Sequence, residues 1–298
     1  MAEVRVEVDG RTLTISNLDK VLYPRTGTTK GEVLDYYARI SPVLLPHLAG
    51  RAVTRIRWPH GTGDGSFFEK NAPRGTPSWV RTVEVPTTGS RGESRHGDTL
   101  VFPVCEDLAT LTWMANLAAL ELHVHQWTVT RTGRVRGADR LVVDLDPGEG
   151  AGLGECSTVA LLARDALAER DLATRPVLSG SKGLHLYADL PRRLDPDDAT
   201  ALAKEVAEEL TAAHPKLVTA TMTKARRTGK VFFDWSQNAG SKTTVSPYSL
   251  RGRDAPTVAA PLSWDEVAEG ADDPLALEQL RFDEVLDRVA ERGDLFAV

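Results

Sequence analysis

Cysteine is scarce in this chain, with only Cys105 and Cys156 among 298 residues. Two cysteines cannot build a disulfide framework or a four-cysteine zinc site, so each is expected to be a small buried hydrophobe. Long apolar runs are also missing, since no stretch approaches the roughly 20 residues of a membrane span. The first residues lack the basic and then apolar pattern of a signal peptide. These absences predict a cytoplasmic protein with no membrane partner.

An excess of positive charge is absent as well, because the formal net charge is −6. This total hides a split: residues 264–298 hold eleven Asp or Glu against three Arg, a net of −8, so the remainder carries +2. Residues 211–233 contain three lysines, two arginines and no acid. Local fields rather than totals steer polyanions, so nucleic acid stays a candidate partner; a solvated basic loop is the alternative.

The chain has neither an internal repeat nor a low-complexity linker. Its 41% hydrophobic and 26% charged residues are typical of a globular protein. Strand-like and helix-like segments alternate, which predicts one α/β or α+β domain over residues 1–298. The capping box Ser263-Trp-Asp-Glu266 predicts a helical acidic tail from about residue 264.

Turn and capping residues locate other elements. Asp9-Gly10 between alternating runs predicts a hairpin over residues 4–15. The capping box Thr29-Lys-Gly-Glu32 predicts a helix, which Pro42 and Pro46 are expected to end. Loops are predicted at 59–77 and 86–99, the second unusually basic. Further strands are predicted at 53–58, 80–85, 121–129, 175–178, 184–190 and 231–235, and helices at 106–120, 158–170 and 197–214.

The most informative segment is Leu141-Val-Val-Asp-Leu-Asp-Pro-Gly148. Its apolar, largely β-branched residues predict a buried strand that Pro147 ends. Asp144 and Asp146 are two residues apart, so their side chains leave the same face. Such close carboxylates repel unless a cation lies between them, and they are preferred ligands of Mg²⁺ and Mn²⁺. Their spacing alone fits a metal site and a solvated acidic turn equally well.

A third carboxylate, Asp234, follows the apolar run Val231-Phe-Phe. Two-metal phosphoryl transfer uses about three carboxylates around ions roughly 3.5–4 Å apart. Asp144, Asp146 and Asp234 supply that set if their strands are neighbours. A strand-end residue or a helix N-cap is the alternative for Asp234.

Two polar segments could bind phosphate. The turn Ser179-Gly-Ser-Lys-Gly-Leu-His185 combines glycines, hydroxyls, a lysine and a histidine, which together suit a phosphate cradle; a tight hairpin is the alternative. Arg251-Gly-Arg253 places two guanidiniums close together, and arginine makes bidentate phosphate contacts. A solvated surface pair is the alternative there.

Aromatic and histidine pairs suggest further contacts. Phe67-Phe68 lies in a predicted loop, where one ring can stack on a base unless both are buried. His123 and His125 alternate with Glu121 on a predicted strand, so these three residues share a face and could bind zinc. We prefer a substrate contact by one histidine, and we expect His125 to be an ordinary core or surface residue.

Taken in order, these segments resemble the archaeo-eukaryotic primase superfamily, and more closely the polymerase domain of bacterial DNA ligase D, which acts in non-homologous end joining. The resemblance covers most of the chain. It is carried by Leu-Asp-Lys-Val-Leu-Tyr-Pro (18–24), Phe-Phe-Glu-Lys (67–70), Asp-Leu-Asp-Pro-Gly-Glu-Gly (144–150), Ser-Gly-Ser-Lys-Gly-Leu-His-Leu-Tyr (179–187), Asp-Trp-Ser-Gln-Asn (234–238) and Pro-Tyr-Ser-Leu-Arg-Gly-Arg (247–253).

The resemblance implies an α+β fold, with a primase-like catalytic core of two mixed β-sheets flanked by helices. It also implies roles for residues. Two Mn²⁺ or Mg²⁺ ions would be held by Asp144, Asp146 and Asp234. The nucleotide would be bound by Phe68, His123, Ser179, Lys182, His185, Gln237, Arg251 and Arg253. The 5′ phosphate of the downstream DNA strand would lie at Asn17, Lys20, Lys30 and Arg57, and the DNA backbone at Lys224 and Arg227. Ile56 departs from the pattern, since relatives carry a basic residue there.

The implied activity is template-dependent or terminal addition of nucleotides to DNA 3′ ends and gaps, with ribonucleotides preferred and priming as a further possibility. DNA ends, gapped DNA, nucleoside triphosphates, Ku and a DNA ligase are the implied partners, in the cytoplasm at the nucleoid. No ligase or nuclease module is recognisable, so the chain is expected to be an excised domain or a stand-alone relative. A carboxylate-metal nuclease and a non-catalytic module that bridges DNA ends are the alternative functions.

Overall fold

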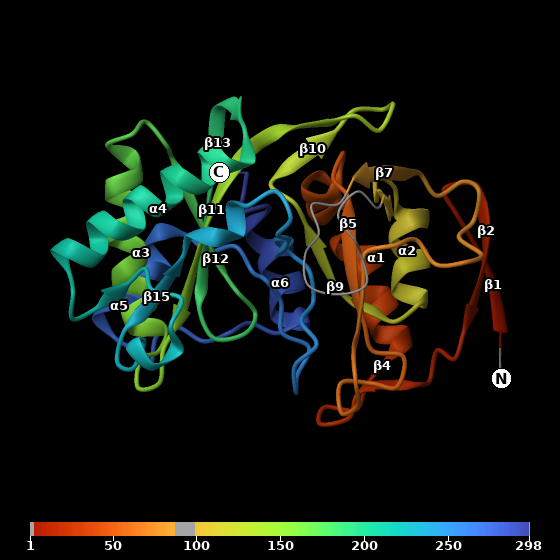
Figure 1. Ribbon diagram of the computed structural model, residues 1–298. Coiled ribbons are helices and arrows are strands. Elements are labelled where there is room, and N and C mark those ends of the chain that lie inside the picture. Colours follow the sequence, from red (N-terminus) through yellow and green to blue (C-terminus); the bar gives the residue numbers. More distant parts are fainter. Residues whose placement is uncertain (1–2, 87–98, 298) are drawn as a thin grey trace.

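The computed structural model describes residues 3–86 and 99–297, and the chain folds into two halves, each built on a sheet, that lie side by side (Figure 1). All but the ends of the predicted basic loop at 86–99 lies outside the described residues. No helix of the described part has the length and apolar character that crossing a membrane requires.

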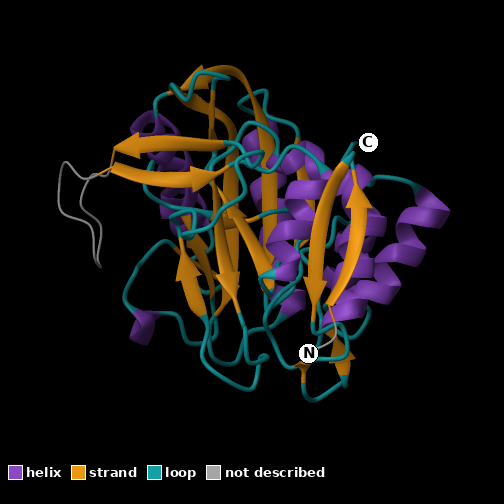
Figure 2. Cartoon of the chain, turned by 90° about the vertical axis from the view of Figure 1, so that its right-hand side faces the viewer, coloured by secondary structure: helices purple, strands orange, loops and turns teal. Residues whose placement is uncertain are grey.

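The N-terminal half surrounds a four-stranded antiparallel sheet of order β16-β9-β5-β6. Its strands are β5 (Val53–Arg57), β6 (Phe67–Glu69), β9 (Ala119–Val124) and β16 (Thr244–Val245). Helices α1 (Lys30–Leu48) and α2 (Leu108–Asn116), hairpin β1 (Glu3–Val8) and β2 (Arg11–Ser16), and the pair β3 (Val21–Tyr23) and β4 (Thr28–Thr29) accompany it. Strands β7 (Thr82–Pro86) and β8 (Thr99–Pro103) form a ribbon that extends to one side (Figure 2).

The C-terminal half is built on a six-stranded mixed sheet of order β12-β13-β11-β15-β14, with β10 also paired to β11. Its strands are β10 (Trp127–Val129), β11 (Val135–Pro147), β12 (Thr174–Leu178), β13 (Leu184–Leu194), β14 (Val218–Thr219) and β15 (Val231–Asp234). The accompanying helices are α3 (Leu153–Ala168), α4 (Pro196–Ala213), α5 (Trp264–Asp272) and the 3-10 helices η1 (Lys224–Arg226) and η2 (Trp235–Asn238). Helix α6 (Phe282–Arg292) lies between the halves and contacts α1 (Figure 1).

Local signals predicted most elements correctly. Asp9 and Gly10 adopt positive φ angles of 51° and 69° in the β1–β2 turn. Thr29 caps α1 with the expected capping box, and Ser263 caps α5. The predicted strand at 121–129 is two strands, β9 and β10, and the predicted loop at 59–77 contains the short strand β6.

The predicted end of α1 is wrong, because the helix continues through Pro42 and Pro46 to Leu48. A proline removes the hydrogen bond to the carbonyl four residues earlier. For Pro42 that carbonyl belongs to Ala38, and the Ser41 hydroxyl donates to it at 2.8 Å. A neighbouring side chain therefore satisfies the carbonyl that the proline leaves open.

One apolar core contains side chains from both halves. Three buried tyrosine hydroxyls add specific links, because Tyr36 of α1 donates to Tyr248 O, Tyr37 to Leu120 O and Tyr187 of β13 to Val245 O. The last bond joins the two sheets. The α+β prediction is thus confirmed, and the packing fixes one sheet against the other.

Candidate active site

Four polar side chains form the centre of the site, in neighbouring strands of the six-stranded sheet. Asp144 of β11 lies directly opposite Asp234 of β15 on one side and His185 of β13 on the other. Directly opposed residues share a face, and Asp146, two residues along, shares it too. His185 Nε2 lies 3.3 Å from Asp144 Oδ1. The structure therefore brings together the three predicted metal ligands and one predicted nucleotide ligand.

The negative charge of this face is incompletely compensated. Loss of water contact, followed by the charge of Asp144, raises the pKa of Asp146 above its usual range, and the charge of Asp234 adds to the effect. Asp146 is nevertheless exposed to solvent at the strand end, so bulk water moderates this shift. Arg227 opposes the shift; its guanidinium lies 3.5 Å from the ring centroid of Phe232, the cross-strand neighbour of Asp146.

Asp234 also caps η2, as the helix-cap alternative anticipated. Its Oδ1 accepts from the amide and hydroxyl of Ser236, and its Oδ2 accepts from Gln237 Nε2 at 2.9 Å. Gln237, predicted to bind nucleotide, therefore orients a carboxylate here. Each carboxylate oxygen has two lone pairs, so these bonds leave acceptor capacity for a cation.

Among residues 3–86 and 99–297, no group of three or more His, Cys, Asp or Glu side chains is arranged closely enough to hold a metal ion as it stands. This contradicts the zinc alternative at Glu121, His123 and His125. His125 is turned away, with Nδ1 2.8 Å from Lys242 O and its ring stacked on Trp127. The aspartates are neighbours without converging on one point, yet their hard oxygens and mutual repulsion suit a divalent cation.

The turn between β12 and β13 is organised by the Ser179 hydroxyl. Its Oγ accepts from the amides of Ser181, Lys182 and Gly183 at 3.1–3.2 Å. These three amides therefore point into the turn, whereas the Lys182 side chain is exposed. A Cβ at Gly183 would overlap the carbonyl oxygen of Leu145 of β11, so glycine lets the turn lie against the strand that carries Asp144.

Arg251 connects this turn to the other sheet. Its Nη1 donates to Ser179 O at 2.9 Å, and its Nε lies 3.3 Å from Glu121 Oε1 of β9. Glu121 also accepts from His123 Nε2 at 2.7 Å and from the amide of Gly252 at 3.0 Å. Arg253 is exposed on the same loop. Predicted nucleotide ligands from both halves are therefore linked.

Phe68 lies on the same face of the four-stranded sheet as Glu121, with Ile56 between them in register. Its ring is 58% exposed, which excludes burial and leaves a face for stacking. Phe67 points to the opposite face and is 53% exposed. The alternative that both rings are buried is therefore wrong.

The four residues predicted to bind a 5′ phosphate gather around the end of α2, on the other side of the same sheet. Lys30 Nζ donates to Ser16 O and Asn116 Oδ1, and Arg57 donates to Leu117 O and Glu69. Asn17 and Lys20 join them through backbone bonds, since the Lys20 amide donates to Asn17 O and the Lys30 amide to Lys20 O. Burial, followed by the charge of Lys20, lowers the pKa of Lys30 to about 8.

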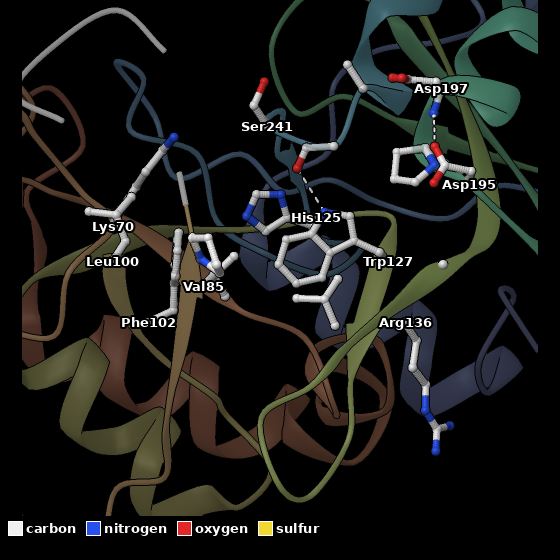
Figure 3. Close-up of a pocket in the computed structure, with 16 residues that line it drawn as sticks. Lys70, Val85, Leu100, Phe102, His125, Trp127, Arg136, Asp195, Asp197 and Ser241 are labelled. Atoms are coloured by element: carbon white, nitrogen blue, oxygen red, sulfur yellow. Dashed lines mark hydrogen bonds between the residues drawn. The ribbon is translucent and has the colours of Figure 1, made fainter. Parts of the chain in front are cut away.

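A cavity of about 640 Å³ lies among the described residues (Figure 3), and none of Asp144, Asp146 and Asp234 lines it. Its lining includes Phe102, His125 and Trp127, with Lys70 on one side and Asp195 and Asp197 on the other. The three rings are almost fully buried. His125 thus packs in the wall of this cavity, which decides between the core and surface positions left open by the sequence. Lys224 lies elsewhere, exposed on η1 near Arg227.

Neither Glu121's contact with Arg251 nor the buttressing of the Ser179 turn was predicted from the sequence. Thr257 Oγ1 donates to Gly180 O at 2.6 Å, and Gln279 Nε2 donates to Gly183 O at 3.1 Å. These two bonds join residues that are 77 and 96 positions apart in the chain. The one local signal in the sequence was the alternation of Glu121 with His123, which indicated that the two side chains share a face of the strand.

Comparison with known proteins gives concordant results. Residues 29–296 match the family model of the LigD primase-polymerase domain. The multifunctional non-homologous end joining protein LigD of Mycolicibacterium smegmatis is 51% identical over 284 residues, 95% of this chain and 35% of that protein. The bifunctional LigD of Bacillus subtilis is 34% identical over 282 residues, 94% of this chain and 43% of that protein. The chain thus spans well under half the length of these relatives.

A solved structure is similar over nearly the whole fold. The polymerase domain of Mycobacterium tuberculosis ligase D in complex with DNA superposes with a TM-score of 0.87 at 50% sequence identity. The match covers 95% of this chain and 96% of that one.

Proposed function

The chain belongs to the family of LigD primase-polymerase domains, and from that premise we propose that it adds nucleotides to DNA 3′ ends and gaps during non-homologous end joining. The membership agrees with the identification made from the sequence motifs, and nucleotidyl transfer of the polymerase type is the enzyme class that it supports.

The observation that carries the proposal is the row of His185, Asp144 and Asp234 across three adjacent strands, with Asp146 on the same face. The three carboxylates would hold two Mn²⁺ or Mg²⁺ ions, for which their hard oxygens are suited. When bound, such ions polarise phosphoryl oxygens and stabilise the charge of attacking and leaving groups. Hydrogen bonds from Ser236 and Gln237 would restrict the orientation of the Asp234 carboxylate.

The nucleotide would lie between the two halves. Phe68 would offer its exposed ring to a base, and His123, which lies on the same face, would lie near the sugar. Lys182, His185, Arg251 and Arg253 would contact the triphosphate, while Ser179 shapes the turn that carries Lys182. We expect ribonucleotides to be preferred, with terminal addition and priming as further activities.

The DNA would contact both halves. Asn17, Lys20, Lys30 and Arg57 would receive the 5′ phosphate of the downstream strand, and Lys224 and Arg227 the backbone. The similar ligase D domain is bound to DNA in its solved structure, which supports DNA as a partner here. Ku and a DNA ligase are proposed partners, in the cytoplasm at the nucleoid, and the fold serves as a single domain with an acidic helical tail from about residue 264.

The test is extension of a 5′-labelled primer on gapped, 5′-phosphorylated DNA with Mn²⁺, comparing ATP with dATP. We expect extension by the wild type, faster with ATP, and none by Asp144→Ala, since a lost carboxylate removes several kcal/mol of charge stabilisation. Near wild-type extension by Asp144→Ala would contradict the proposal. Primer shortening would favour a nuclease, and tight DNA binding without incorporation a non-catalytic end-bridging module.

A further inference from the structure

Glu121 is a buried carboxylate for which the proposed reaction has no direct use. It is 5% exposed in the middle of β9. A buried carboxylate costs free energy unless it is paired and hydrogen-bonded, so its surroundings indicate what holds it there. Those surroundings are all groups of the candidate nucleotide site.

Three of these groups meet at the two carboxylate oxygens. His123 Nε2 lies 2.7 Å from Oε2, while the Gly252 amide, at 3.0 Å, and Arg251 Nε, at 3.3 Å, lie at Oε1. The contact with Arg251 is electrostatic rather than a well-aligned hydrogen bond. Burial opposes the charged form of Glu121, but the bond from His123 and the charge of Arg251 outweigh it and lower the pKa to about 2. Glu121 is therefore an anion at neutral pH.

The first consequence concerns His123. A carboxylate only accepts hydrogen bonds, so the bond to Glu121 requires a proton on Nε2. This leaves Nδ1 as the remaining polar atom of a ring that is 13% exposed. In the neutral ring Nδ1 is an acceptor, the complement of a sugar hydroxyl that donates.

The second consequence concerns the distance between the two sheets. The Arg251 guanidinium lies between Glu121 of the four-stranded sheet and Ser179 O of the six-stranded sheet. The Gly252 amide fixes the same loop to Glu121, and Gly252 packs against Trp58 so closely that a Cβ would overlap its ring. The Glu121 carboxylate thus determines both the orientation of the His123 ring and the position of the loop that carries Arg251 and Arg253.

We propose that Glu121 is a positioning residue that couples recognition of the sugar to recognition of the triphosphate, by holding His123 in one tautomer and Arg251 across the gap between the sheets. This inference rests on the proposed function. It assigns to Glu121 a role in nucleotide affinity and in discrimination between ribose and deoxyribose, with no contact to the reacting atoms.

The experiment measures kcat and KM for ATP and dATP on gapped, 5′-phosphorylated DNA with Mn²⁺. For Glu121→Ala we expect KM for ATP to rise at least tenfold, kcat to change less than threefold and the preference for ATP over dATP to fall. Glu121→Gln should lie between, because its amide oxygen still accepts from Gly252 while the charge that holds Arg251 is lost.

The matched control is Glu266→Ala, which removes another ionised carboxylate that holds an arginine, Arg288, between α5 and α6. It should lower the melting temperature while KM and the ATP preference stay within twofold of wild type. The inference would be overturned if Glu121→Ala left KM for ATP unchanged. It would also be overturned if Glu121→Ala, like the control, lowered the melting temperature while KM and the ATP preference stayed within twofold of wild type. An inactive wild type would instead refute the proposed function.

A spectroscopic measurement keeps the inference testable if Glu121→Ala fails to fold. Long-range ¹H–¹⁵N NMR reports which imidazole nitrogen carries the proton. We expect Nε2 of His123 to be protonated in the wild type and both neutral tautomers to be populated in Glu121→Gln at high pH. The same single tautomer in both proteins would contradict the positioning role.

Discussion

The aspartates at the end of β11 and the basic side chains around the end of α2 are both candidate binding sites, and they differ in how far the protein satisfies their charges. Asp144, Asp146 and Asp234 gather negative charge, and His185 and Arg227 oppose part of its effect on Asp146. Lys30 and Arg57, in contrast, already donate to protein oxygens. The first site is therefore expected to depend on added cations, whereas two of the cations at the second site already have protein partners, so we expect that site to gain less from binding a ligand.

The largest effect should come from Asp234→Asn, which removes charge but keeps the shape and an acceptor oxygen. Loss of one metal ligand costs several kcal/mol, so extension should fall by about 10²–10³-fold with little change in melting temperature. Asp189→Asn, on β13 of the same sheet and paired with Arg175, is the control and should extend primers normally. Equal extension rates for Asp234→Asn and wild type would contradict the claim that the aspartate site, unlike the basic cluster, depends on added cations.

Gly183→Ala should be the next most harmful change. Its Cβ would overlap Leu145 O, and relieving such an overlap costs about 1–3 kcal/mol. Moving the turn away from β11 should also lower extension by at least about tenfold, since small misplacements at a reacting centre are costly. Gly63→Ala, where a Cβ makes an ordinary contact, should leave both the melting temperature and the rate unchanged.

A smaller effect is expected at the basic cluster. A charge-assisted hydrogen bond contributes about 1.5–3 kcal/mol, and Arg57 would gain only part of this from a phosphate because it already donates to protein oxygens. Arg57→Ala should therefore weaken binding to 5′-phosphorylated gapped DNA by only about three- to tenfold. Binding to 5′-hydroxyl DNA should change less, as titrations of both DNAs would reveal. An equal loss of affinity for both DNAs would contradict the assignment of this cluster to the 5′ phosphate.

The smallest effect concerns the tail, which belongs to neither site. Burial alone would raise the pKa of Glu266. The hydrogen bond and charge of Arg288, with bonds from Ser263, outweigh that effect and lower the pKa from 4.5 to about 2. This contribution to stability is present above pH 4.5 and is lost as the pH falls toward 2. Glu266→Gln should therefore melt about 2–4 °C lower at pH 7, with a smaller difference at pH 3. A difference independent of pH would show that the ion pair contributes nothing.

The carboxylate site was predictable where its signals are local. Strand periodicity put Asp144 and Asp146 on one face, and strand-end position marked Asp234. Their direct pairing, however, depends on the register between β11 and β15, which no local pattern contains. The capping boxes and the Asp9-Gly10 turn were correct for the same reason, since a few neighbouring residues determine them.

Features that depend on distant partners were missed. Strand β6 is only three residues long, and it exists because β5 pairs with it. The course of α1 through Pro42 was missed for another reason, because a local bond from Ser41 to the carbonyl of Ala38 outweighs the general tendency of proline to end a helix. Glu121 meets Arg251 only after both halves are folded, so its central position in the site could not be read from the sequence.

The central claim, that three aspartates hold the ions on which extension depends, is tested most directly by titrating the protein with Mn²⁺ and following the free ion by electron paramagnetic resonance. With a non-hydrolysable ATP analogue present, wild type and Arg57→Ala should deplete the free signal equally. Asp144→Ala and Asp234→Asn should leave most of it. Equal depletion by wild type and Asp144→Ala would contradict the account.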